Sequence, residues 1–109
     1  MQDTFGKIKA AFATGRAYYS RHARNEMFAE EFGPISDLEV SQIIASGEII
    51  REYQDDRPYP SMLILGFTNA RRPIHIVTAY APESDTAIVI TVYEPDPKLW
   101  TDFRTKREP

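Results

Sequence analysis

Cysteine is missing from this 109-residue sequence. Its absence excludes disulfides, thiolate chemistry and zinc sites built from cysteine, and it suits a reducing compartment. Glycine is scarce, with five residues, and the sequence contains no glycine-rich phosphate loop. The zinc motif HExxH and the nucleophile elbow GxSxG are absent as well. These gaps exclude several large classes of enzyme.

Long apolar runs are also lacking, and none approaches the roughly 20 residues of a membrane helix. Residues 1–15 place Asp3, Lys7 and Lys9 among their apolar positions, so they lack the apolar centre of a secretory signal. The sequence therefore predicts a cytoplasmic protein that does not enter the membrane. Its length fits a single domain over residues 1–109.

Positive charge is in short supply, since the formal net charge is −3. Nucleic-acid binders are usually basic, because lysine and arginine neutralise phosphates. The negative net charge therefore argues against strong nonspecific binding to nucleic acid. The basic residues nevertheless cluster: Arg16, Arg21 and Arg24; Arg71 and Arg72; Arg104, Lys106 and Arg107. Such clusters fit either a small phosphate-binding patch or an ordinary solvated surface.

The first half of the chain has the periodicity and end signals of helices. Asp3 can cap a first helix over about residues 3–14, which Gly15 ends. Ser20 can cap a second helix over residues 21–32 after a short extended piece. Ser36 and Glu39 form a capping box for a third helix that ends at Gly47. We expect the buried side of this third helix to consist of Leu38, Val40, Ile43 and Ile44.

The second half changes to the patterns of strands over residues 48–53, 61–68, 73–80 and 86–93. Their short polar connections imply antiparallel neighbours. Asp96 followed by Pro97 predicts a short C-terminal helix, and residues 104–109 read as a frayed tail. Helices first and strands afterwards predict an α+β fold. In it, N-terminal helices pack on a four-stranded, mostly antiparallel sheet.

The two histidines are the default candidates for proton transfer, because imidazole titrates near neutrality. His22 lies in the first turn of the second helix, four residues before Glu26, so the two side chains can pair. It is either an oriented acid–base group or an ordinary surface pair. His22, Glu26 and His75 follow no metal-binding motif, and we expect no metal or other cofactor.

Strand alternation predicts which side chains could join His75. Ile74 and Ile76 are expected to face the helices, which directs His75 to the opposite face. By the same alternation Ile49, Arg51 and Tyr53 share a face on the first strand, and Val89, Thr91 and Tyr93 share one on the last. If the registers agree, a polar surface suited to a phosphate ester results. The pattern is also typical of a half-solvated sheet, and a one-residue slip would scatter the group.

Several segments resemble the domain-of-unknown-function family 4258: residues 19–23, 39–50, 72–77 and 90–96, the last followed by Trp100. The resemblance covers about residues 17–103. It implies a bacterial protein similar in architecture to RelE/ParE-like toxins and barnase-like nucleases. It also implies that His22 and His75 match the family's two histidine positions. Family members often carry arginine four residues after the first histidine, where this chain has Glu26.

Two hypotheses follow from the polar face and the resemblance. The first is a metal-independent, RelE-like endoribonuclease or toxin-like RNA-interacting domain. Its catalytic candidates are His22, His75, Arg51 and Tyr93, and its binding candidates are Arg24, Tyr53, Thr91 and Arg72. The second is a non-catalytic interaction or dimerisation domain, whose partner would be a protein such as an antitoxin. An enzyme would gather both histidines and an arginine in one cleft, whereas an interaction domain would expose an apolar patch.

Overall fold

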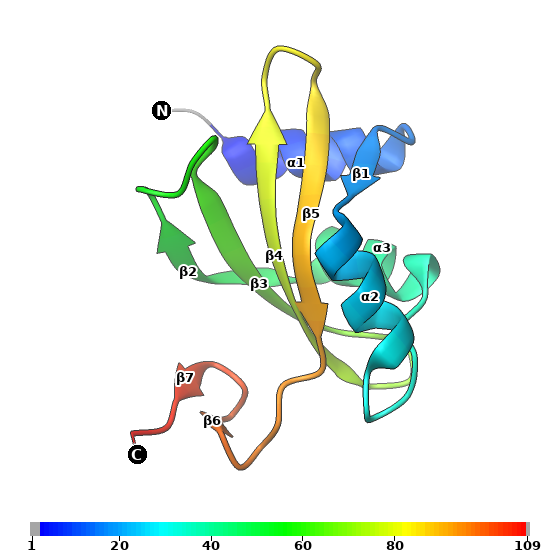
Figure 1. The fold of residues 1–109 in the computed structure, drawn as a ribbon, viewed down its shortest axis with the longest axis vertical. Coiled ribbons are helices and arrows are strands. Elements are labelled where there is room, and N and C mark those ends of the chain that lie inside the picture. The colour runs from blue at the N-terminus through cyan, green and yellow to red at the C-terminus, as the bar shows by residue number, and fades with distance from the viewer. Residues whose placement is uncertain (1–2, 109) are drawn as a thin grey trace.

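The computed structural model describes residues 3–108, and these form an α+β fold, as predicted (Figure 1). The helices are α1 (Thr4–Ala13), α2 (Arg21–Ala29) and α3 (Asp37–Ser46). The strands are β1 (Ala17–Tyr19), β2 (Glu48–Tyr53), β3 (Ser61–Phe67), β4 (Pro73–Ala81), β5 (Thr86–Tyr93), β6 (Trp100–Thr101) and β7 (Thr105–Lys106). Within these residues no helix is long and apolar enough to cross a membrane.

Capping side chains set the starts of the helices. The Asp3 carboxylate accepts a hydrogen bond from the backbone N–H of Gly6 at 2.9 Å. Ser36 and Glu39 form the predicted capping box, in which each side chain accepts a bond from the other's backbone N–H. These bonds satisfy N–H groups that the first turn leaves unpaired. The second helix ends at Ala29, earlier than the predicted residue 32.

One mixed sheet contains five strands in the order β1-β5-β4-β3-β2. Strands β2 to β5 are antiparallel neighbours, as their short connections predict. The predicted number of four strands is wrong, because β1 adds a fifth strand parallel to β5. Ala17 pairs with Ala87, far along the chain, so no local pattern signals this pairing.

Helices α1 and α3 pack on one face of the sheet, and α2 packs against β5 (Figure 1). The core between them includes Ile8, Val40, Ile43, Ile64, Ile76 and Val92, all with no exposed area. Leu38 was expected in this core, but it is 68% exposed. It lies two positions before Val40 and therefore on the opposite side of α3.

Two β-bulges alter the faces that simple alternation predicts. In β2 the register shifts between Ile49 and Arg51, so Ile49 pairs with Ile64 and leaves the face that Arg51 occupies. In β5 a second shift places Val89 in the core, while Thr91 keeps the opposite face. We call this side of the sheet, away from α1 and α3, the second face.

The predicted C-terminal helix is wrong. Residues 96–108, here the C-terminal segment, instead form a turn and the antiparallel pair β6 and β7. Asp102 and Phe103 have φ angles of 51° and 62°, which make the tight reversal between the two strands and cannot continue a right-handed helix. The Trp100 side chain is 7% exposed, and the Phe103 ring meets Phe67 edge-on. This packing overrides the local helix signal.

Candidate functional site

The second face brings together most of the side chains that sequence analysis grouped there. On β5, Tyr93 pairs with His75 and Thr91 pairs with Val77. On β2, Arg51 pairs with Leu63 and Tyr53 with Ser61. Since residues opposite one another in a ladder point to the same side, His75, Arg51, Tyr53, Thr91 and Tyr93 share the second face.

His75 is fully buried on this face, beneath the C-terminal segment. Its ring meets Trp100 edge-on, with 4.5 Å between the ring centroids. Nε2 lies 2.6 Å from the Phe103 carbonyl oxygen, and Nδ1 lies 3.0 Å from the Tyr93 hydroxyl. A carbonyl can only accept, which assigns the proton to Nε2 and makes Nδ1 the acceptor for the Tyr93 hydroxyl. Burial lowers the pKa of His75, although the bond to Phe103 opposes this shift, so the neutral ring is favoured.

Tyr93 is half-buried beside His75, and its surroundings keep it protonated. Burial, followed by the charges of Tyr53 and Glu26, raises the pKa of Tyr93 to about 12, while Arg51 acts to lower it. Tyr53 and Arg51 lie on the same face of the sheet as Tyr93. With its hydrogen directed to His75, the hydroxyl retains oxygen lone pairs that can accept a bond from a ligand.

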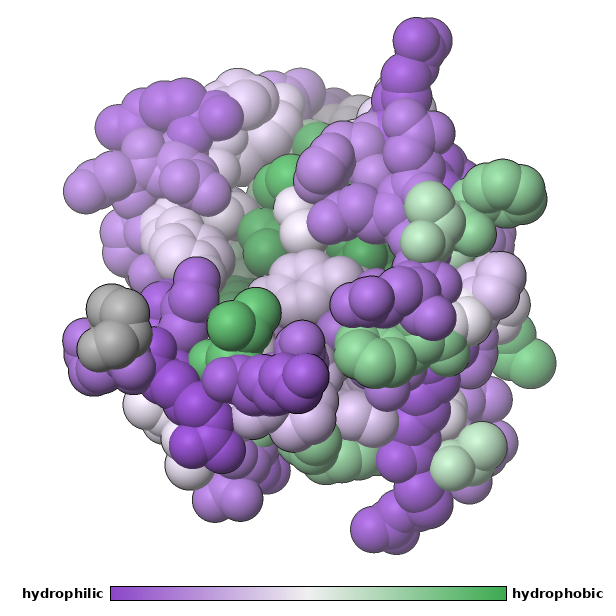
Figure 2. All heavy atoms as spheres, turned by 60° about the horizontal axis from the view of Figure 1, so that its bottom comes forward, coloured by the Kyte–Doolittle hydropathy of each residue, from purple (hydrophilic) through white to green (hydrophobic). Residues whose placement is uncertain are grey.

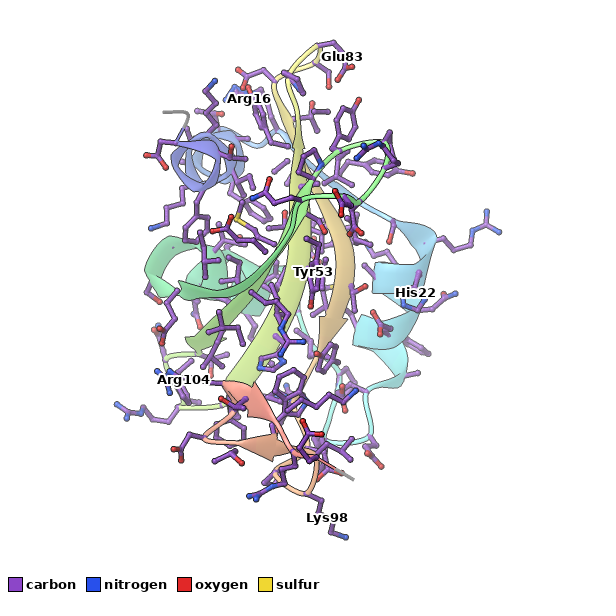
Figure 3. All side chains as sticks on the ribbon, turned by 90° about the vertical axis from the view of Figure 1, so that its left-hand side faces the viewer. Arg16, His22, Tyr53, Glu83, Lys98 and Arg104 are labelled. Carbon is purple, nitrogen blue, oxygen red and sulfur yellow. The ribbon has the colours of Figure 1, made fainter. Side chains whose placement is uncertain are left out.

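His22 occupies a different environment on α2. Its side chain is 67% exposed, and its Nε2 lies 3.3 Å from Glu26 Oε1. Glu26 Oε1 also accepts a hydrogen bond from the backbone N–H of Val92 at 2.9 Å. Within residues 3–108, His22 and His75 share no hydrogen bond. Figure 3 shows His22 on α2 and Tyr53 beside the sheet.

Glu26 has a structural role at the edge of the sheet. Strand β1 ends at Tyr19, so the edge of β5 beyond Val89 has no neighbouring strand. Glu26 and Glu30 accept hydrogen bonds from the N–H groups of Val92 and Glu94 at this edge. Burial raises the pKa of Glu26, and the bond from Val92 counteracts it. The two carboxylates accept the hydrogen bonds that the carbonyl groups of a neighbouring strand would otherwise accept.

The predicted binding residue Arg24 is engaged in packing α2 against α3. Its guanidinium forms a two-pronged ion pair with Asp37 and lies over the Tyr19 ring, 3.8 Å from the centroid. The hydrogen bond to Asp37 raises the pKa of Arg24. Arg24 lies away from the second face, where Arg51 is found.

Arg72, the other predicted binding arginine, links three parts of the fold. Its Nε donates to Glu94 Oε1 at 2.5 Å, and its Nη1 donates to the Pro34 carbonyl at 3.0 Å. Further bonds reach the Gly33 carbonyl and Glu39. The side chain is only 18% exposed. Its bonds connect the α2–α3 turn, α3 and the end of β5, which leaves few donors for a ligand.

A basic cleft lies beside Arg51, between β2 and the C-terminal segment, with a volume of about 620 Å³. It is lined by Arg51, Lys98, Leu99, Lys106, Arg107 and Glu108. Lys106 and Arg107 lie in the predicted frayed tail, but Lys106 belongs to β7 and the backbone N–H of Arg107 donates to the Leu99 carbonyl. The β6–β7 hairpin brings these residues to Lys98, and local patterns carry no signal for this. In the described part of the chain, no group of three metal-ligating side chains could hold an ion.

Comparison with known proteins identifies one family. The model of the family described as Domain of unknown function (DUF4258) matches residues 19–94. The matched segment contains His22, His75, Arg51 and Tyr93, but it excludes α1 and the C-terminal segment. No curated protein and no solved structure matches the chain. Since the match spans well over half of the residues, the chain belongs to the Domain of unknown function (DUF4258) family.

Proposed function

We propose that this domain binds single-stranded RNA on the second face of its sheet and does not cleave it. The observation that carries the proposal is the grouping of Arg51, Tyr53, Thr91 and Tyr93 on this face. Arginine neutralises a phosphate with a planar pair of donors, and tyrosine rings stack on bases of any sequence. Figure 2 looks at the molecule from the side of the C-terminal segment and shows a hollow with hydrophobic atoms, surrounded by hydrophilic side chains.

Three observations favour binding over cleavage. Hydrolysis of RNA needs one group that takes the proton of the ribose hydroxyl and another that protonates the leaving oxygen. His75 uses both ring nitrogens within the fold and lies under Trp100. His22 is paired with Glu26 on α2, apart from His75. Tyr93, with a pKa of about 12, is a poor base at neutral pH.

The test is fluorescence anisotropy with a labelled oligouridine RNA at low salt. We expect Arg51→Ala and Tyr53→Ala each to weaken binding on the order of tenfold, because each removes either one phosphate-binding cation or one ring that stacks on a base. Arg71→Ala and Tyr59→Ala, which change the same residue types in connecting loops, serve as matched controls and should bind like the wild type. The RNA should remain intact on a gel after incubation.

Two outcomes would overturn this proposal. If the wild-type protein does not bind the oligonucleotide, the second face is not an RNA site. If RNA fragments appear and His75→Ala or His22→Ala abolishes them while the protein stays folded, the domain is an endoribonuclease, contrary to the non-catalytic part of the proposal.

Self-association is a second candidate function, favoured by exposed apolar side chains where α2 meets α3. Phe28 is 83% exposed and Leu38 is 68% exposed. The Arg24–Asp37 ion pair links α2, which carries Phe28, to the start of α3, which carries Leu38. Light scattering should then detect a dimer that Phe28→Ser abolishes and the control Tyr18→Ser does not. A monomer at all concentrations would exclude this function.

A further inference from the structure

The basic cleft concentrates positive charge in an acidic chain. Its cations come from separate parts of the sequence: Arg51 from β2, Lys98 from the turn after β5, Lys106 from β7 and Arg107 just after β7. With Glu108 as the single lining carboxylate, four cations less one anion give the cleft a charge of +3. The whole chain has a formal charge of −3. The fold therefore segregates charge of one sign at this place.

Within the described residues, several arginines elsewhere in the chain are paired with carboxylates, whereas the lysines and arginines of the cleft are not. Arg16, Arg24, Arg72 and Arg104 each form an ion pair with a carboxylate. Among residues 3–108, the cleft's cations form none. Arg107 donates through Nε to the Pro97 carbonyl at 3.0 Å, and its terminal nitrogens have no further partner in this range. Like charges gathered in a cleft attract an anion, which relieves their mutual repulsion.

The C-terminal segment holds these cations in place rather than trailing as a tail. Trp100 packs on His75, and the Phe103 carbonyl accepts the proton of His75 Nε2. Arg104 forms two bonds to Glu48 at the start of β2, at 2.5 and 3.1 Å. The backbone N–H of Arg107 donates to the Leu99 carbonyl at 2.8 Å. A site anchored in this way needs less ordering when a ligand binds.

We propose that the basic cleft binds phosphate groups of the RNA backbone and forms the phosphate-binding half of the RNA site. This inference rests on the proposed function and names a second part of its binding surface. Arg51 joins the two parts, because it lines the cleft and also shares the second face with Tyr53 and Tyr93. An RNA strand whose bases stack on Tyr53 and Tyr93 would pass its next phosphates into the cleft. Lys98, Lys106 and Arg107 all lie beyond residue 94, where the family match ends.

The test measures RNA binding by the full chain as the salt concentration rises. The Lys98→Ala/Lys106→Ala variant removes two cleft charges, and Lys7→Ala/Lys9→Ala removes two from α1 as a matched control. For single strands, the slope of log affinity against log salt changes by about 0.7 for each phosphate that the protein neutralises. We expect the cleft variant to bind on the order of tenfold more weakly at low salt, with a slope shallower by about 1.4 because it neutralises two fewer phosphates. The control variant should keep the wild-type affinity and slope.

Separate measurements distinguish a wrong assignment of the cleft as a phosphate site from a wrong proposal that the domain binds RNA. If the cleft variant binds like the wild type while Tyr53→Ala weakens binding, the cleft is not part of the site, although the RNA proposal stands. If the wild type binds no RNA, both are overturned, and an NMR titration with sodium pyrophosphate decides whether the cleft binds phosphate at all. Amide shifts at Lys98, Leu99 and Lys106 that vanish in the cleft variant would retain a phosphate site for a ligand other than RNA. Circular dichroism verifies that each variant is folded.

Discussion

Arg72 illustrates how one side chain can hold several elements together. Its guanidinium donates to Glu94, Glu39 and the carbonyls of Gly33 and Pro34, and little of it is exposed. Replacing it with alanine would leave these acceptors without their donor. We expect Arg72→Ala to lower the free energy of unfolding by about 2–4 kcal/mol.

The neighbouring residue provides the control for this prediction. Arg71 is exposed in the β3–β4 turn, and Arg71→Ala should change stability by less than about 0.5 kcal/mol. Urea denaturation followed by circular dichroism measures both variants. Equal stabilities of the two variants would contradict the linking role of Arg72.

His75 should make the stability of the fold depend on pH. Burial lowers its pKa in the folded protein below the ordinary value of 6.5. As the pH falls below about 6.5, the unfolded chain binds a proton that the folded chain does not, so the free energy of unfolding decreases. This decrease continues until the pH reaches the folded-state pKa, and the effect is absent well above 6.5.

The measurement is urea denaturation of the wild type and of His75→Gln at a series of pH values from about 8 down to about 5. The wild type should lose more stability over this range than the variant, because the variant lacks the titrating ring. Parallel pH profiles would contradict the prediction and would show that His75 does not govern this part of the pH dependence.

Single residues also show where sequence patterns suffice. Alternation along β4 correctly predicts that His75 faces away from Ile74 and Ile76, because strand alternation is a local property. The burial of His75 cannot be predicted in this way. Its cover consists of Trp100 and Phe103, which arrive from a later segment through tertiary contacts.

At the scale of elements, the C-terminal segment offers an internal probe. Trp100 is the only tryptophan in the chain, and it packs on the buried ring of His75. If this segment is an integral part of the fold, it must unfold together with the sheet. We expect tryptophan fluorescence and far-UV circular dichroism to give the same urea midpoint. A lower midpoint by fluorescence would show that the segment detaches first.

Local signals predict some elements better than others for a physical reason. The capping box at Ser36 and the alternation in β4 depend on residues close in sequence, and both are present in the structure. The parallel pairing of β1 with β5 depends on residues far apart. The bulges of β2 and β5 likewise depend on neighbouring strands, and each reverses the face assigned to one residue, Ile49 and Val89.

On the scale of the whole molecule, net charge proves a coarse guide to binding. An overall charge of −3 argues against nucleic acid, yet the fold collects unpaired cations around one cleft. Ion pairs such as Arg24–Asp37 and Arg104–Glu48 neutralise other basic residues locally. A sequence reveals how many charges exist, whereas the fold determines which of them remain available to a ligand.

The whole molecule also extends beyond the family segment at both ends, and the two extensions should differ in importance. Helix α1 contributes Ile8 and Ala11, both fully buried, to the core cluster, which includes no residue after Val92. Removing residues 1–15 would expose the core side of α3, and we expect this variant to lose cooperative unfolding. Removing residues 96–109 uncovers His75 on the second face but leaves the core intact, so that variant should fold with reduced stability. NMR spectra and urea denaturation measure both deletions, and a cooperatively folded protein without residues 1–15 would show that the core is complete without α1.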